Sequence, residues 1–384
     1  MNRINTLKRS FSTSNKVIFE YHRNNVKVTL NNEKALNAVD FDMLTALKDE
    51  INKWTTTKKY PDVMILTTNP ESKAFSAGGD VKHLLSLKTS MKDNYEELEK
   101  YFKLEYEVDY LLSKLKDKQV ITVALWNGIV MGGGAGISLN SLFKVACEKT
   151  IFAMPEARIG LFTDIGAVYH LTKLPEGLRN AMGLACMRLK GEEVYLSGLA
   201  SDFVNKDDFG KLTAEIFSIS EEDFNLRKQE VGSIIHDLSS KIGTNAIEAF
   251  RNKVNKLESA CTGRSVEEIY KKLSEDKEPL SQELSKNMAM NSPLSMKVIL
   301  KHFEFAKQLD LRTNYLLDFQ IIQHYMRMDE FFIGVKNLLV DKSKEAPNWT
   351  YEKLEDVDDK FVEKIFHEKP KDATSELDRK IFKL

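Results

Sequence analysis

The sequence predicts an α/β protein (α+β in the arrangement of its elements), with strand and helix units in the first part and helices in the second. Short apolar runs typical of buried strands alternate with amphipathic segments as far as about residue 211. From about Leu212 the strand signals fade, and long charged segments with helical periodicity follow. The chain has 384 residues, of which 42% are hydrophobic, so it can bury a substantial core.

A β-hairpin is predicted to open the fold. Its strands are the apolar segments from Val17 to Tyr21 and from Val26 to Leu30, separated by a turn. Asp40 is then expected to cap a helix in which apolar residues recur at helical spacing up to Trp54. A buried strand from Val63 to Leu66 follows, so the order is strand, strand, helix, strand.

The same alternation returns later in the chain. Val120 to Leu125 is a predicted strand that enters a glycine-rich turn, a short helix from about Gly134 to Leu142, and a strand from Phe143 to Ala146. Beyond residue 211, segments such as Asn245 to Leu257 and Val266 to Leu273 are amphipathic at helical spacing. The last part of the chain is therefore predicted to be mostly helical.

The first nineteen residues have the composition of a mitochondrial transit peptide. They contain four basic residues and several hydroxyl residues, and no acidic residue precedes Glu20. The alternative is an ordinary disordered basic start. We therefore predict a transit peptide over residues 1–15, a core over residues 16–211, a helical region over residues 212–384, and a location in the mitochondrial matrix.

Composition excludes several kinds of partner. The net charge is −1, so the chain has no global basic field to attract nucleic acid. No apolar run approaches the roughly 18 to 20 residues of a membrane-spanning helix, so no membrane partner is expected. The three cysteines lie far apart and form no CxxC pair, which argues against both a disulfide framework and a zinc site. We expect no metal.

Two glycine-rich turns follow buried strands and lead into helical segments. One runs from Ala74 to Asp80 and the other from Asn127 to Gly136. Glycine allows a ligand to approach the main chain closely, and exposed backbone N–H groups near a helix start can stabilise a negative oxygen. Two such turns can face one carbonyl oxygen, which is the design of an oxyanion hole. The alternative is that the glycines serve only tight packing.

Two acids stand in a stretch that is otherwise rich in apolar and turn-forming residues, Glu156 and Asp164. An acid in apolar surroundings is a candidate for catalysis, although both side chains are also compatible with solvated turns or a helix cap. The chain has no G-x-S-x-G, no H-E-x-x-H, and neither glycine turn completes a nucleotide-binding motif. Carboxylates are therefore the predicted reactive groups.

Taken together, these segments resemble the crotonase superfamily, and within it the 3-hydroxyisobutyryl-CoA hydrolase family. The resemblance extends over nearly the whole chain after the leader. Besides the two glycine turns and Met154-Pro155-Glu156, it rests on further motifs in the same order: Glu105-Tyr106, Gly160-Leu161-Phe162, Arg188-Leu189-Lys190-Gly191, Ser292-Pro293, and Gly334-Val335. It implies a spiral of ββα units with perpendicular sheets, followed by a helical C-terminal region.

The resemblance also implies an activity and its residues. The substrate would be an acyl-CoA thioester, with no separate cofactor because CoA is part of the substrate. The backbone N–H groups of Ala77 and Gly133 would form the oxyanion hole. Glu156 would act as the nucleophile, Asp164 would orient water or the substrate, and Glu105 would join Gly133, Glu156 and Asp164 in substrate binding. A homo-oligomer is a further expectation.

Gly136 distinguishes this chain from the hydratases of the superfamily. In these a glutamate occupies that position and acts together with the glutamate that Glu156 matches, so addition of water to a double bond is disfavoured. An enoyl-CoA hydratase or isomerase is nevertheless the alternative among enzymes. Proteins resembling this hydrolase also occur as components of some mitochondrial ribosomes, and such an association is the one context in which a nucleic-acid partner is expected.

Overall fold

The computed structural model describes residues 8–11, 15–90, 95–370 and 373. It contains two compact units, each assembled from three segments of the chain. The first unit comprises Met1–Gly79, Glu107–Phe152 and Leu189–Ile247. The second comprises Asp80–Tyr106, Ala153–Arg188 and Glu248–Leu384. The units therefore interleave along the sequence, whereas the boundary predicted at residue 211 cuts the chain only once.

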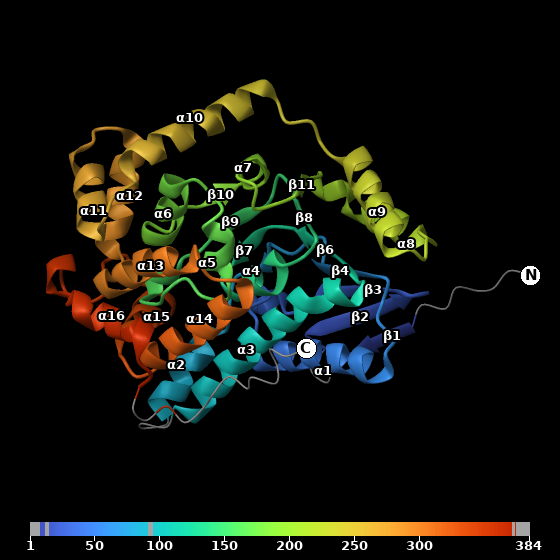
Figure 1. The fold of residues 1–384 in the computed structure, drawn as a ribbon, viewed down its shortest axis with the longest axis horizontal. Helices are drawn as coiled ribbons and strands as arrows, with labels where there is room; N and C mark the ends of the chain where they lie inside the picture. The colour runs from blue at the N-terminus through green and yellow to red at the C-terminus, as the bar shows by residue number, and fades with distance from the viewer. Residues whose placement is uncertain (1–7, 12–14, 91–94, 371–372, 374–384) are drawn as a thin grey trace, which may run out of the picture. The chain divides into compact units, whose positions relative to one another are not determined.

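The strands form two sheets (Figure 1). The seven-stranded sheet has the order β1 (Lys8–Phe11), β2 (Val17–His22), β3 (Asn25–Leu30), β4 (Val63–Thr68), β6 (Ile121–Trp126), β8 (Phe143–Ala146) and β11 (Asp202–Phe203). The four-stranded sheet has the order β10 (Leu189–Lys190), β9 (Ile151–Ala153), β7 (Ile129–Met131) and β5 (Ala74–Ser76). Mixed pairing with interspersed helices confirms the predicted fold class.

The predicted opening elements are confirmed. Strands β2 and β3 form an antiparallel hairpin in which Val17 pairs with Leu30. The Asp40 carboxylate accepts a hydrogen bond from the Met43 N–H at 2.9 Å and so caps helix α1 (Phe41–Thr57). β4 then runs parallel to both β3 and β6. Residues 8–11 of the predicted leader form β1, antiparallel to β2, and residues 1–7 and 12–14 lie outside the described residues.

Helices cover both faces of the seven-stranded sheet. The Trp54 indole N–H of α1 donates to the Tyr21 hydroxyl on β2 at 2.9 Å. Neighbouring residues of a strand point to opposite faces of the sheet. Ile18 and Glu20 of β2 therefore lie on the face opposite to α1. On that other side, helices α8 (Phe209–Ser218) and α9 (Phe224–Leu238) pack on the sheet and bury one continuous apolar cluster, whose largest contributors are residues of β4, β6, α8 and α9.

The first unit also contains short helices, and two long helices have residues in both units. Helices α4 (Gly133–Leu139) and α7 (Glu192–Leu196) belong wholly to the first unit. Helix α3 (Glu96–Lys114) begins in the second unit and ends in the first, and helix α10 (Thr244–Ala260) does the reverse.

The rest of the second unit is built from helices. They are α2 (Val81–Ser90), α5 (Ala167–Leu171), α6 (Glu176–Leu184), α11 (Val266–Glu275), α12 (Pro279–Met290), α13 (Pro293–Ala306), α14 (Leu311–Tyr325), α15 (Glu330–Val335) and α16 (Asp359–His367). Most residues of helix α13 are buried, and it packs against α5, α6 and α16. Gly183 permits the approach of α6, because a Cβ there would lie 2.9 Å from the Phe303 ring. Past β11 the described chain is helical between its loops, which confirms the helical C-terminal region.

The packing of α9 on the sheet provides a test of the core. Ile235 is fully buried, whereas Leu226 on the same helix is 53% exposed. Ile235→Ala should lower the free energy of unfolding by about 2 to 5 kcal/mol, because the deletion leaves a cavity in a close-packed cluster. The matched variant Leu226→Ala should change it by less than about 0.5 kcal/mol. Urea unfolding measures both, and equal effects would contradict this assignment of the core.

Candidate active site

The two glycine turns come together in the four-stranded sheet of the first unit. β5 and β7 run parallel as neighbours, so the turns that follow them leave from the same edge. A Cβ added to Gly78 would lie 3.5 Å from the Met131 carbonyl oxygen and 3.9 Å from the Gly133 nitrogen. Gly134 has no room for a side chain, because a Cβ there would lie 2.6 Å from that of Ser76, whereas the contacts at Gly78 are ordinary. The glycines therefore allow direct contact between two backbone turns.

The hydrogen bonds of these turns decide which N–H groups can serve a ligand. The Ala77 N–H donates to the Leu36 carbonyl at 3.0 Å, which argues against the predicted oxyanion role of Ala77. The Gly78 N–H lies 3.4 Å from the Ser76 hydroxyl. The N–H groups of Gly79 and Gly133 have no hydrogen-bond acceptor within the described residues. These two donors, and not the pair Ala77 and Gly133, are thus the free ones at this edge.

The predicted acids gather in the second unit. Glu156 opens a short 3-10 turn, Glu156–Ile159, directly after Pro155, and is only 3% exposed. Asp164 follows in the same loop and accepts a hydrogen bond from the Tyr106 hydroxyl at 2.7 Å. Glu105, the neighbour of Tyr106 on α3, is also buried. The structure therefore brings together the three carboxyl groups that the sequence had singled out.

These carboxyl groups perturb one another's ionisation. Burial raises the pKa of Glu156 well above its ordinary range, and the negative charges of Asp164 and Glu105 raise it further. Burial also raises the pKa of Asp164 to about 7, although the Tyr106 hydrogen bond lowers it in part. The pKa of Glu105 is raised by burial first and then by the charge of Asp164. These carboxyl groups therefore keep their protons to a higher pH than ordinary carboxyl groups do.

Glu156 has the geometry of an available nucleophile. Its Oε2 is buried and has no hydrogen-bond partner within the described part of the protein. A carboxylate that is neither solvated nor hydrogen-bonded is more reactive than one in water once it loses its proton. Asp164, in contrast, is held by a hydroxyl donor, which suits a group that orients another molecule.

Sequence reasoning missed the residues that surround Asp164. Tyr106 stood in the motif Glu105-Tyr106, but no role was assigned to it, and the buried pair His302 and Asp318 was not noticed. One signal was present: Asp318 lies on the same helical face as Tyr315 and Phe319, so an acid interrupts an otherwise aromatic face. His302 carries no comparable signal in the sequence.

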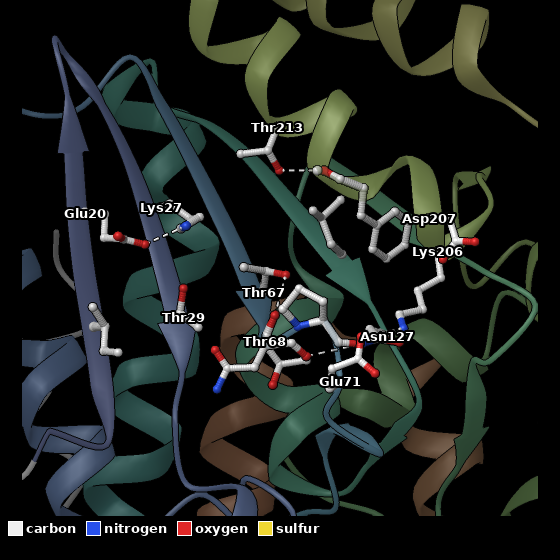
Figure 2. A pocket seen from close by; sticks show the side chains of 16 residues that line it. Glu20, Lys27, Thr29, Thr67, Thr68, Glu71, Asn127, Lys206, Asp207 and Thr213 are labelled. Carbon is white, nitrogen blue, oxygen red and sulfur yellow. Dashed lines mark hydrogen bonds and ion pairs between the residues drawn. The ribbon is translucent and has the colours of Figure 1, made fainter. Parts of the chain in front are cut away.

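A separate cavity of about 470 Å³ lies in the first unit beside α8 (Figure 2). Its lining includes four threonines and two lysines, and both lysines are paired with carboxylates. Lys27 lies 2.5 Å from Glu20, and Lys206 lies 3.4 Å from Glu71. None of the predicted site residues lines this cavity.

The described residues provide neither a cluster of metal-ligating side chains nor a membrane-spanning helix. They contain no group of three or more His, Cys, Asp or Glu side chains arranged to hold a metal ion. Among them there is also no helix whose length and apolar character would suit a bilayer.

Comparison with known proteins identifies the family. Residues 26–366 match the family model described as enoyl-CoA hydratase/isomerase. The chain belongs to this family. Among solved structures, a carnitinyl-CoA dehydratase from Mycobacterium thermoresistibile superimposes with a TM-score of 0.81 at 22% identity, covering 94% of this chain and 98% of that one. At this identity the likeness supports the fold alone.

Curated relatives share more of the sequence. A mitochondrial 3-hydroxyisobutyryl-CoA hydrolase of Dictyostelium discoideum is 34% identical over 374 residues, which cover 96% of each chain. The protein of the same name from Gallus gallus is 31% identical over 342 residues, or 88% of this chain and 85% of the relative. These relatives confirm the resemblance seen in the motifs. Because they are mitochondrial and the first nineteen residues of this family member are basic and acid-free, the protein is assigned to the mitochondrion.

The raised carboxyl pKa values of this family member predict how its stability depends on pH. The pKa of Asp164 is about 7 in the folded protein instead of its ordinary 3.8, so its contribution to stability is complete in acid and is lost as pH rises through about 7. Asp164→Asn removes the need to ionise, and should stabilise the protein at pH 8 by up to about 4 kcal/mol relative to wild type.

Thermal unfolding of both proteins between pH 5 and pH 8 measures this effect. Glu156→Gln should behave in the same direction, because burial raises the pKa of Glu156 as well. A separation between wild-type and variant melting temperatures that stays constant over this pH range would contradict the prediction.

Proposed function

We propose that the protein hydrolyses the thioester of 3-hydroxyisobutyryl-CoA, and also that of 3-hydroxypropionyl-CoA, to the free acid and CoA, a reaction of valine degradation. The observation that carries this proposal is the buried carboxyl cluster of Glu105, Glu156 and Asp164, with Gly136 where a hydratase has its second acid. The names of the relatives support the same substrate. The substrate brings CoA with it, and the reaction needs no further cofactor.

Glu156 is proposed as the nucleophile. Its ionised carboxylate attacks the thioester carbonyl carbon, the carbon–sulfur bond breaks, and CoA leaves as a thiol after taking up a proton. The product is a mixed anhydride between the acyl group and Glu156. Water then hydrolyses the anhydride and restores the carboxylate. No electrons are gained or lost overall, in keeping with a cluster of acids alone.

Asp164 and Glu105 are proposed to position the reactants. Asp164 can hold a water molecule or the substrate hydroxyl, since only one of its oxygens is engaged by Tyr106. Its pKa of about 7 allows it to accept a proton from the attacking water and release it again near neutral pH. Glu105, buried beside it, is assigned to binding the small hydroxylated acyl group.

The negative oxygen formed during attack is proposed to bind the N–H groups of Gly133 and Gly79. Gly79 takes the role first predicted for Ala77, because the Ala77 N–H is committed to Leu36. Two preorganised donors of this kind stabilise a developing charge by several kcal/mol, provided that neither is used elsewhere. A homo-oligomer of this chain is a further proposal, and it rests on family membership alone.

Activity with a panel of short acyl-CoA esters tests the proposed function. Release of free thiol should be fastest with 3-hydroxyisobutyryl-CoA and 3-hydroxypropionyl-CoA. Hydration of crotonyl-CoA, followed in the same preparation, should be negligible, because Gly136 supplies no second carboxyl group. Hydration faster than hydrolysis would favour the hydratase alternative and overturn the proposal.

Two isosteric substitutions separate the nucleophile from the positioning acid. Glu156→Gln should reduce hydrolysis by several orders of magnitude while CoA-ester binding persists, because the attacking charge is lost. Asp164→Asn should reduce it by about 10² to 10⁴-fold, since the amide can still accept a hydrogen bond. Wild-type turnover by Glu156→Gln would rule out a covalent role.

Labelled water distinguishes the covalent path directly. In a single turnover in ¹⁸O-water, attack on the enzyme carbonyl of the anhydride leaves label in the Glu156 carboxylate, which mass spectrometry of the peptide detects. Direct attack of water on the thioester cannot label Glu156.

A further inference from the structure

The loop that carries Asp164 has an unusual backbone. Ile165 has a φ of 55° and Gly166 a φ of 66°, so two consecutive residues are left-handed. For a β-branched residue such as isoleucine this conformation is a genuine outlier and costs free energy. The turn lies directly after Asp164, and it therefore sets the direction in which the Asp164 carboxyl leaves the main chain. Contacts with other residues must therefore hold the turn in this conformation.

Helix α14 supplies the restraint through Asp318. Oδ2 of Asp318 accepts a hydrogen bond from the Gly166 N–H at 2.7 Å. Both residues are in the second unit, and Asp318 is fully buried. The Tyr315 ring, one turn earlier on α14, closes over the same glycine, because a Cβ on Gly166 would lie 2.7 Å from Cζ of that ring. The turn is thus fixed by one hydrogen bond and one close packing contact.

The same face of α14 also packs against Tyr106, the hydrogen-bond donor to Asp164. The Tyr106 ring, whose hydroxyl donates to Asp164, packs edge-on against Phe319 with ring centroids 6.3 Å apart. It also contacts Tyr315 at a centroid distance of 6.4 Å. Residues 315, 318 and 319 of α14 therefore touch both the turn behind Asp164 and the donor in front of it.

The second oxygen of Asp318 faces a buried histidine. Oδ1 lies 3.2 Å from Nε2 of His302 on α13, and neither atom has a hydrogen-bond partner among the described residues. Two lone pairs at this distance repel, so one proton is needed between them. Burial lowers the pKa of His302 to about 3 and raises the pKa of Asp318 well above its ordinary range, with the charge of Asp164 as a further contribution. Both shifts favour a neutral Asp318, whose protonated oxygen donates to His302 while its other oxygen accepts from Gly166.

We propose that Asp318 is a positioning residue for the hydrolysis: backed by His302, it holds the Gly166 N–H, and so fixes the left-handed turn that aims the Asp164 carboxyl. This inference rests on the proposed function for its catalytic consequence. The anchoring of Gly166 does not depend on that function. Asp318 itself touches no reacting atom, and it acts through the loop of Asp164.

Two variants of Asp318 test the inference, since a neutral carboxylic acid and an amide present the same pattern of one acceptor and one donor. Asp318→Asn should keep kcat and KM within about threefold of wild type. Asp318→Ala loses the acceptor, and should lower kcat by about 10²-fold, the effect of a misplacement of the order of 1 Å, with KM little changed. Asp310→Ala, which removes the N-cap of the same helix, is the matched control and should lower the melting temperature without lowering kcat.

A double variant shows whether Asp318 acts through Asp164. In the Asp164→Asn background, Asp318→Ala should cost less than about threefold in kcat, because the group that it positions is already inactive. Losses that multiply would overturn the inference. A wild-type kcat in Asp318→Ala would also overturn it, and so would a loss of more than about tenfold in kcat of folded Asp318→Asn. The result for Asp318→Asn remains decisive if the alanine variant fails to fold.

Hydrogen exchange gives a readout that is independent of activity. The Gly166 amide should exchange slowly in wild type and in Asp318→Asn, and much faster in Asp318→Ala. Unchanged protection in Asp318→Ala would overturn the anchoring role. A wild-type protein that hydrolyses no short acyl-CoA would contradict the proposed function instead, and the exchange measurements would still decide whether Asp318 anchors the turn.

Discussion

The second unit is organised around a cluster of buried carboxyl groups. Among the described residues, no cationic side chain is hydrogen-bonded to them. Glu105, Glu156 and Asp164 are each less than 5% exposed, and burial raises the pKa of each. Removing a charge from water is costly unless a partner compensates it, so a protein that lacked a use for these groups would gain stability by replacing them. The cluster is retained against this cost, which is the pattern of a site selected for reactivity instead of stability.

The described surroundings of the cluster keep it ordered without placing a cationic side chain beside Asp164. Tyr106 donates to Asp164, the aromatic face of α14 packs on Tyr106, and Asp318 holds the Gly166 turn. These contacts use neutral donors and ring packing, which leave the carboxyl pKa values high. An arginine or lysine in the same place would order Asp164 equally well, but it would lower its pKa and remove the ability to exchange a proton near neutral pH.

The glycine turns of the first unit concern backbone N–H groups instead of carboxyl groups. Their task, as proposed, is to present two free N–H groups, and a backbone donor left unpaired away from water costs about as much free energy as a lost hydrogen bond. Gly134 allows the turns to approach so closely that a side chain there would collide with Ser76, and Gly78 adopts a φ of +112°, which disfavours other residues. The parallel pairing of β5 and β7 then aligns the two turns at one edge, and the hydrogen bond of Ala77 to Leu36 leaves Gly79 available.

Most local features could be predicted from the sequence alone: the β2–β3 hairpin, the Asp40 cap, the glycine turns, and the two acids Glu156 and Asp164 as candidates for the reactive groups. Each depends on periodicity, on turn chemistry, or on a motif within a few residues, which are short-range properties. The tertiary structure alone decided which N–H groups are free, which hydroxyl donates to Asp164, and which residue holds the turn that follows it. Those outcomes depend on Leu36, Tyr106 and Asp318, which lie 41, 58 and 152 residues from Ala77, Asp164 and Gly166, respectively. No local pattern encodes contacts across such distances, because burial and hydrogen bonding are set only when the segments pack together.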